Sequence, residues 1–125
     1  MKQEREMKDK GKRLSDPTRM KESEKIDSVQ KKYLEKVKKS LLQRYAGIFK
    51  IWCISCFGQS ATIFIFYKTA KELECVDKTD MTDHINAFLQ KTGYFDRFGE
   101  QVFVEFDSDE NVKKNYEGNY YYRIL

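Results

Sequence analysis

The stretch that decides the fold is "IWCISCFGQSATIFIFY", residues 51–67, an apolar segment in a chain in which 35% of the residues are charged. Three interpretations compete for it: a membrane span, a Cys-x-x-Cys site, and the interior of a small globular domain. Its first half continues a helical pattern, whereas its second half is β-branched and aromatic, as strands are. We therefore expect the end of a helix, a turn beginning at Gly58, and a buried central strand.

Apolar residues at helical spacing lead into this stretch, and lysines lie between them. The pattern predicts a long amphipathic helix from about Glu22 to Phe57, ended by Gly58. Residues 1–20 are charged and aperiodic, so we expect a disordered basic arm there and a single domain over residues 21–125. The apolar positions are Ile26, Val29, Tyr33, Val37, Leu41, Tyr45, Ile48, Trp52 and Cys56.

The remainder of the chain alternates between strand and helix patterns. The segments "ATIFIFYKT", "QVFVEFD" and "NYYYRIL" are typical of strands. Between the first two, a helix is expected over residues 82–92 with Thr82 as its N-cap, and Ser108 is expected to cap a short helical turn. The predicted fold class is α+β: a long N-terminal amphipathic helix packed on a small antiparallel sheet of about three strands, with one further helix.

A membrane span over residues 45–67 is the first alternative. The segment is long enough to cross a bilayer, and basic residues precede it. However, Lys50 lies inside it and a Gly-Gln-Ser sequence interrupts its middle. We expect two water-soluble elements instead, and a membrane-anchored protein remains the alternative.

A zinc site is the second alternative, because Cys53, Cys56, Cys75 and His84 follow the spacing C-x2-C-x18-C-x8-H. Cys53 and Cys56 lie on the apolar stripe, where a free cysteine packs as a small hydrophobe. We therefore predict packed thiols, with no metal and no cofactor. An odd number of cysteines and the lack of an apolar leader favour a cytoplasmic location.

The motifs of catalysis are missing from the sequence. It contains one histidine, no nucleophile motif and no phosphate-binding glycine loop. Glu105 and Asp107 could share one face of a strand, as a pair of catalytic carboxylates would, but a solvated strand face explains them more simply. We predict a protein that is not an enzyme.

The charge distribution suggests the kind of partner. Residues 1–44 hold 15 basic and 8 acidic side chains, whereas residues 72–117 hold 5 basic and 12 acidic ones. An acidic, tyrosine-rich surface suits a basic protein partner. The first hypothesis is thus a small protein-interaction module, similar in kind to an inhibitor or antitoxin, that binds its partner through Tyr116, Tyr120, Tyr122, Asp107, Asp109 and Glu110.

Two other partners remain open. The basic N-terminal part could contact the phosphates of a nucleic acid through Lys10, Lys12, Arg13 and Arg19. A second copy of the chain could pack on the helical stripe formed by Leu34, Leu41, Tyr45, Ile48 and Trp52, giving a homodimer.

Overall fold

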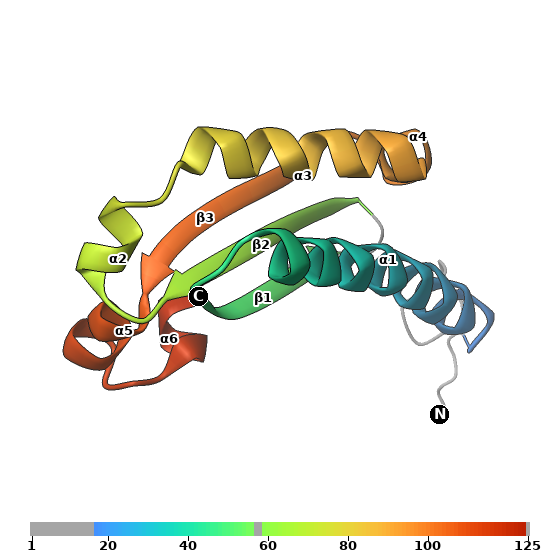
Figure 1. The fold of residues 1–125 in the computed structure, drawn as a ribbon. Coiled ribbons are helices and arrows are strands. Elements are labelled where there is room, and N and C mark those ends of the chain that lie inside the picture. The colour runs from blue at the N-terminus through green and yellow to red at the C-terminus, as the bar shows by residue number, and fades with distance from the viewer. Residues whose placement is uncertain (1–16, 57–58, 125) are drawn as a thin grey trace, which may run out of the picture.

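The structure, a computed structural model, describes residues 17–56 and 59–124, except for the side chains of residues 17–26 and of Cys56. The described chain is α+β, with a mixed three-stranded sheet and helices that pack on it (Figure 1). The elements in chain order are α1 (Pro17–Arg44), β1 (Ile48–Cys56), β2 (Ser60–Tyr67), α2 (Ala70–Glu74), α3 (Lys78–Thr92), α4 (Tyr94–Phe98), β3 (Val102–Ser108), α5 (Asp109–Asn115) and α6 (Tyr120–Ile124).

The sheet has the order β1-β2-β3 and combines both kinds of pairing. Strands β1 and β2 form an antiparallel hairpin, whereas β2 and β3 are parallel, from Ala61 beside Val102 to Tyr67 beside Ser108. The prediction of an antiparallel sheet is therefore wrong for β3. The chain between β2 and β3 contains α2, α3 and α4, and a connection through helices is what returns a strand to the parallel orientation.

The predicted continuation of the first helix to Phe57 is also wrong. Helix α1 ends at Arg44, and Gly47, at φ 87°, turns the chain in the left-handed region that glycine adopts without strain. Residues 48–56 then form β1 instead of a helix end. The apolar residues of this stretch occupy both odd and even positions, as in a strand that is packed on both faces. Some of these positions also fit the spacing of a helix, which led to the wrong prediction.

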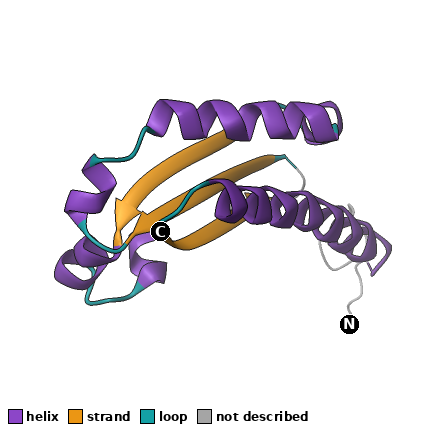
Figure 2. Ribbon diagram, viewed as in Figure 1, coloured by secondary structure: helices purple, strands orange, loops and turns teal. Residues whose placement is uncertain are grey.

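Helices α1, α3 and α4 cover one face of the sheet, which we call the first face (Figure 2). Leu34, Val37 and Leu41 of α1 are buried there together with Ile85 and Leu89 of α3. The strand residues of this core are Ile51, Ala61, Ile63, Ile65 and Tyr67, with Cys53, Val102, Val104 and Phe106 packed against it.

The burial of α1 also bears on the predicted homodimer stripe. Leu34 and Leu41 are 2% and 0% exposed, so they face the sheet of their own chain. Trp52, the last residue of the stripe, belongs to β1 and packs on the other face. Leu34 and Leu41 are therefore not available to a second copy, whereas Tyr45, Ile48 and Trp52 are half-buried, and the homodimer stays a prediction.

The helix predicted over residues 82–92 is found as α3, with a different start, but the prediction of one further helix is wrong because α2, α4, α5 and α6 are also present. Helix α3 begins at Lys78, because the Asp77 side chain accepts a hydrogen bond from the N–H of Asp80 (2.9 Å). It ends at Gly93, as predicted. The Ser108 cap is confirmed as well, since the Ser108 hydroxyl accepts a bond from the N–H of Asn111 (3.0 Å) at the start of α5.

The third predicted strand, at the C-terminus, is a helix. Asn119 accepts hydrogen bonds from the N–H groups of Tyr121 (2.9 Å) and Tyr122 (3.3 Å), which begins α6. Within α6 the spacing of four residues places Tyr120 and Ile124 on one side of the helix, where both pack against the sheet. This apolar contact overrides the preference of tyrosine for strands.

Candidate protein-binding face

The candidate site lies on the second face of the sheet, opposite the first core. Alternate residues of each strand point to this face, and pairing across the sheet aligns them in three rows. The rows are Lys50–Phe66–Asp107, Trp52–Phe64–Glu105 and Ile54–Thr62–Phe103. The cover over these rows differs from one end of the sheet to the other.

Helices α5 and α6 cover the first row and part of the second. The Tyr120 ring stacks on Trp52, with ring centroids 5.8 Å apart, and meets Phe66 edge-on at 4.7 Å. Val112 of α5 and Ile124 of α6 complete this cluster, in which Phe64 and Phe66 are 6% and 0% exposed. The C-terminal segment is therefore part of the folded core.

Polar contacts hold α6 in this position. The Tyr120 hydroxyl donates to Oδ1 of Asp109 (2.5 Å), which is only 5% exposed and also pairs with Lys113 (3.1 Å). The hydrogen bond from Tyr120 lowers the pKa of the Asp109 carboxyl. Burial and the same hydrogen bond raise the pKa of the Tyr120 hydroxyl, so it stays a donor.

Asp107 is held in a second set of contacts. It accepts hydrogen bonds from Arg123 of α6 and from the Asn111 side chain (2.9 Å). Desolvation raises the pKa of Asp107, but the bonds from Arg123, the Ser108 N–H and Asn111 outweigh it and lower the pKa overall. Nη2 of Arg123 also lies 3.5 Å from Oε1 of Glu105, so the two strand carboxylates share one cation.

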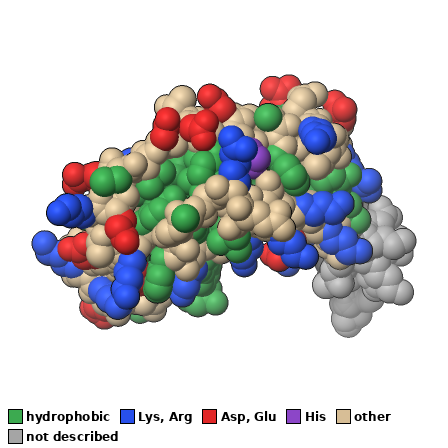
Figure 3. Space-filling model, in the orientation of Figure 1, with side chains coloured by type: hydrophobic (Ala, Val, Ile, Leu, Met, Phe, Trp, Pro, Cys, Tyr) green, Lys and Arg blue, Asp and Glu red, His purple; other side chains and the backbone are tan. Residues whose placement is uncertain are grey.

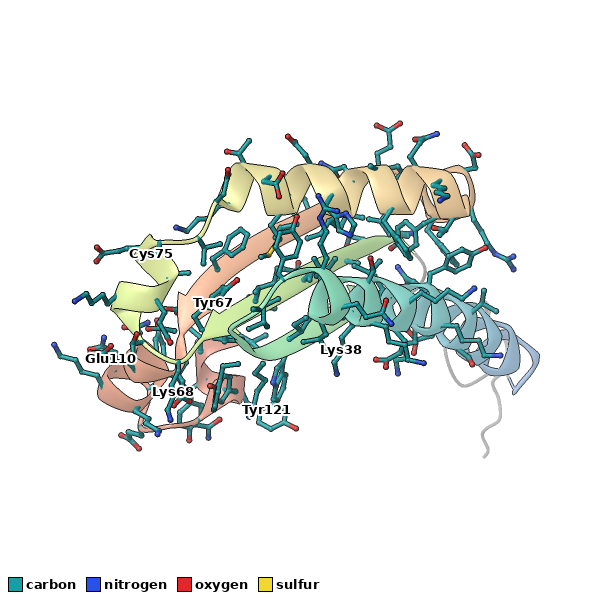
Figure 4. All side chains as sticks on the ribbon, in the orientation of Figure 1. Lys38, Tyr67, Lys68, Cys75, Glu110 and Tyr121 are labelled. Atoms are coloured by element: carbon teal, nitrogen blue, oxygen red, sulfur yellow. The ribbon has the colours of Figure 1, made fainter. Side chains whose placement is uncertain are left out.

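Beyond this cover the second face is open. Ile54 and Phe103, at the two ends of the third row, are 41% and 56% exposed. Tyr121, 68% exposed, meets Trp52 edge-on with ring centroids 5.2 Å apart. Figure 4 shows Tyr121 on the side of the molecule away from α3. We call the surface formed by Trp52, Ile54, Thr62, Phe103, Glu105 and Tyr121 the open face.

The open face has the composition of a binding surface. Contiguous exposed apolar side chains on a folded domain mark interaction sites more often than isolated ones do. Its one charged group, Glu105, has a half-exposed side chain between Phe103 and the Arg123 contact. The open face therefore combines exposed apolar groups with a carboxylate that is half-exposed and contacts Arg123.

The predicted partner-binding residues gather in the same region, but most of them hold the fold together. Asp107, Asp109 and Tyr120 are committed to contacts within the chain, and Tyr116 packs against the cluster under α6. Tyr122 is 57% exposed. Glu110 is exposed and accepts a bond from the N–H of Ala70 (2.9 Å).

Sequence reasoning missed Ile54 and Phe103. The signal was present for Phe103, because the alternation in "QVFVEFD" puts Phe103 and Glu105 on the face opposite to Val102 and Val104. The signal for Ile54 was hidden by the helical interpretation of β1.

The proposed metal ligands lie on different elements. Cys53 is on β1 beneath α1, Cys75 is exposed at the end of α2, and His84 of α3 is hydrogen-bonded to Ser40 of α1 (2.9 Å). Burial raises the pKa of the Cys53 thiol to about 11, as expected for a packed cysteine. Across residues 27–55 and 59–124, no three His, Cys, Asp or Glu side chains come together as metal ligands would. The side chain of Cys56 lies outside the described part.

The predicted nucleic-acid residues fall outside the described side chains. Lys10, Lys12 and Arg13 precede residue 17, and Arg19 lies in the first turns of α1, where only the backbone is described. Among the described residues, no helix has the length and hydropathy needed to span a bilayer. The stretch 45–67 instead contains the whole of β1 and of β2.

Comparison with other proteins adds no further constraint. A scan against protein-family models finds no match, and neither the curated proteins nor the solved structures contain a chain with significant similarity.

Proposed function

We propose that this protein is a non-enzymatic interaction module whose open face binds a basic protein partner, as an inhibitor or antitoxin-like binder would. One observation carries the proposal: apolar side chains of two strands, Ile54 and Phe103, stay exposed on the face of the sheet that also bears a half-exposed carboxylate, Glu105. Aromatic residues such as Tyr121 supply contact area at a small entropic cost.

The charge of the chain segment that contains both α3 and β3 supports a basic partner. Figure 3 shows Asp and Glu side chains along α3, whereas Lys and Arg side chains gather over α1. Strand β3 belongs to the segment 72–117, in which 12 acidic residues outnumber 5 basic ones. A negative electrostatic potential of this kind accelerates the association with a basic protein and disfavours the association with an acidic protein.

Capture from native lysate tests the proposal. The full chain is immobilised, and lysate treated with nuclease is passed over wild type and over the variant Phe103→Asp. We expect wild type to retain a basic protein and Phe103→Asp to lose it, because a carboxylate replaces an apolar contact next to Glu105.

The matched control is Leu42→Asp, which places the same charge at an exposed apolar residue of α1 (51% exposed). It should retain the partner, and the free energy of unfolding of both variants should stay within about 0.5 kcal/mol of wild type. Equal capture by wild type and Phe103→Asp, or capture that disappears with nuclease, contradicts the proposal.

A second candidate function is nucleic-acid binding through α1. The observation that favours it is a row of exposed lysines, Lys32, Lys36 and Lys39, on the outer side of this helix. Glu35 and the Asp27–Lys31 ion pair (3.1 Å) interrupt the row. If α1 binds nucleic acid, replacing the three lysines by glutamine should weaken binding and reduce its salt dependence by about three phosphate contacts.

A further inference from the structure

Strand β3 lies at one end of the sheet, and no other strand of the described residues pairs with its outer edge. The Ala61 N–H donates to the Gln101 carbonyl (3.0 Å). In a parallel pair alternate residues bond to the neighbouring strand, so this bond determines which residues of β3 turn their backbone groups toward β2. Phe103 and Glu105 therefore turn their backbone groups toward β2, and Val104 and Phe106 turn theirs outward. Within residues 27–55 and 59–124, the N–H and C=O groups of Val104 and Phe106 have no hydrogen-bond partner.

The two edges of the sheet differ in their protection against strand addition. In β1 the register shifts between Ile48 and Lys50, an irregularity that twists an edge away from a flat partner. In β3 the register is unbroken from Val102 to Ser108, and the strand contains neither proline nor bulge. An edge without a bulge or a proline accepts strands from other chains more readily, and the charged side chains of β3, Glu105 and Asp107, then select against an acidic strand.

The side chains next to the free edge define what an added strand must contain. On the second face it would lie beside Phe103 and Glu105, which are two residues apart and both half-exposed. Cross-strand neighbours on one face are favourable when apolar groups meet and when opposite charges meet. The incoming strand thus needs an apolar residue and, two positions away, a lysine or arginine.

We propose that the β3 edge takes up a fourth strand, an extended segment of the basic partner that carries an apolar residue and a Lys or Arg two positions apart. The inference rests on the proposed function and names how the partner binds. Charge complementarity favours such a segment over a second copy of the chain, because β3 of a second copy would bring its own Glu105 and Asp107 to this acidic edge.

A proline at position 104 separates edge pairing from face binding. The Val104 N–H points outward, so Val104→Pro removes no bond to β2, and proline is tolerated at such positions of edge strands. The variant blocks strand addition because it lacks the donor and crowds the edge. Its free energy of unfolding, measured with urea, reports whether the fold is kept.

The probes are two nine-residue peptides, TVTVTKTVT and TVTVTETVT, which are acetylated at the N-terminus and amidated at the C-terminus. In a strand their valines lie on one face together with the Lys of the first peptide or the Glu of the second. We expect wild type to bind the Lys peptide about fivefold more tightly than the Glu peptide, and Glu105→Lys to invert this preference. Val104→Pro should weaken binding of the Lys peptide by about tenfold or more. No binding to wild type at about 1 mM peptide, or equal binding by Val104→Pro, overturns the inference.

Hydrogen exchange gives a readout that does not depend on the proline variant. In free wild type the amides of Val104 and Phe106 should exchange faster than those of Phe103 and Glu105, which donate to β2. Saturation with the Lys peptide should slow the exchange of the Val104 and Phe106 amides, and unchanged exchange contradicts strand addition.

Capture from lysate separates failure of this inference from failure of the proposed function. If the partner is lost by Phe103→Asp but kept by Val104→Pro, the open face binds without strand addition. If both variants keep the partner, the proposed function itself fails.

Discussion

The two faces of the sheet carry similar apolar side chains but differ in how far helices cover them. Under α1 and α3, the residues of β2 that point to the first face, Ala61, Ile63, Ile65 and Tyr67, are at most 4% exposed. On the second face the cover of α5 and α6 reaches Phe64 and Phe66 but leaves Ile54 and Phe103 exposed. The comparison teaches that apolar residues on one sheet divide into those that stabilise the fold and those that are free to meet a partner.

The largest effect is expected from truncating matched isoleucines on the two faces. Ile63→Ala removes a side chain that is 0% exposed and leaves a cavity, which should lower the free energy of unfolding by about 2–5 kcal/mol. Ile54→Ala removes a side chain that is 41% exposed and should cost less than about 1 kcal/mol. Urea unfolding measures both, and equal losses would contradict the division between the faces.

The next effect concerns the boundary between the covered and open parts of the second face. Tyr120→Phe removes the hydroxyl that donates to the buried Asp109, which should cost about 1–3 kcal/mol. Tyr121→Phe is the control, because this neighbouring ring is 68% exposed, and it should change stability by less than about 0.5 kcal/mol. If the two variants unfold alike, α6 is not fastened by the Tyr120–Asp109 bond.

Acid should loosen the second face through Asp107 and Asp109. The pKa values of both carboxyls are lowered in the folded state. The hydrogen bond from Tyr120 is the main cause for Asp109. For Asp107, desolvation raises the pKa, but the hydrogen bonds from Arg123, Ser108 and Asn111 outweigh it. A lowered folded pKa contributes stability that is present above the unfolded value of about 3.9 and is lost as the pH falls through the folded value. We expect the stability of Asp107→Asn to fall less steeply than that of wild type below about pH 4, measured by urea unfolding at several pH values. If the stability of wild type and of Asp107→Asn falls equally steeply below about pH 4, Asp107 contributes no such stability.

The smallest effect on the fold is expected from thiol modification. Cys75 is exposed, whereas Cys53 is packed in the first core with its pKa raised to about 11. Iodoacetamide at pH 8 should therefore label Cys75 at least about tenfold faster than Cys53, as peptide mapping by mass spectrometry would report. Fast labelling of Cys53 would mean that α1 does not shield the first face.

Part of this architecture could be predicted because the signals are local. The Ser108 cap, the end of α3 at Gly93 and the strand character of residues 60–67 and 102–108 each depend on a few adjacent residues. The class of fold, α+β with strands around a helix pattern, follows from them.

The errors arose where tertiary contacts decide the local structure. Residues 48–56 satisfy helical spacing and strand composition together, and only the pairing of β1 with β2 selects the strand. The Tyr120–Ile124 segment has strand composition, but its contact with Trp52 and Phe66 selects a helix. For the candidate site, the acidic and tyrosine-rich region could be located from the sequence. The sequence could not show which side chains of this region make contacts within the fold and which stay exposed.

The parallel pairing of β2 with β3 has a consequence for the order of folding. The β1–β2 hairpin closes through a few intervening residues, whereas β3 reaches β2 only after the 34 residues between Tyr67 and Val102 have been arranged. Long loops delay contact formation because their closure costs more entropy. During synthesis and refolding, β2 therefore waits with one side unpaired while the helices assemble, and we expect mutations in the hairpin to slow folding and mutations in β3 mainly to accelerate unfolding.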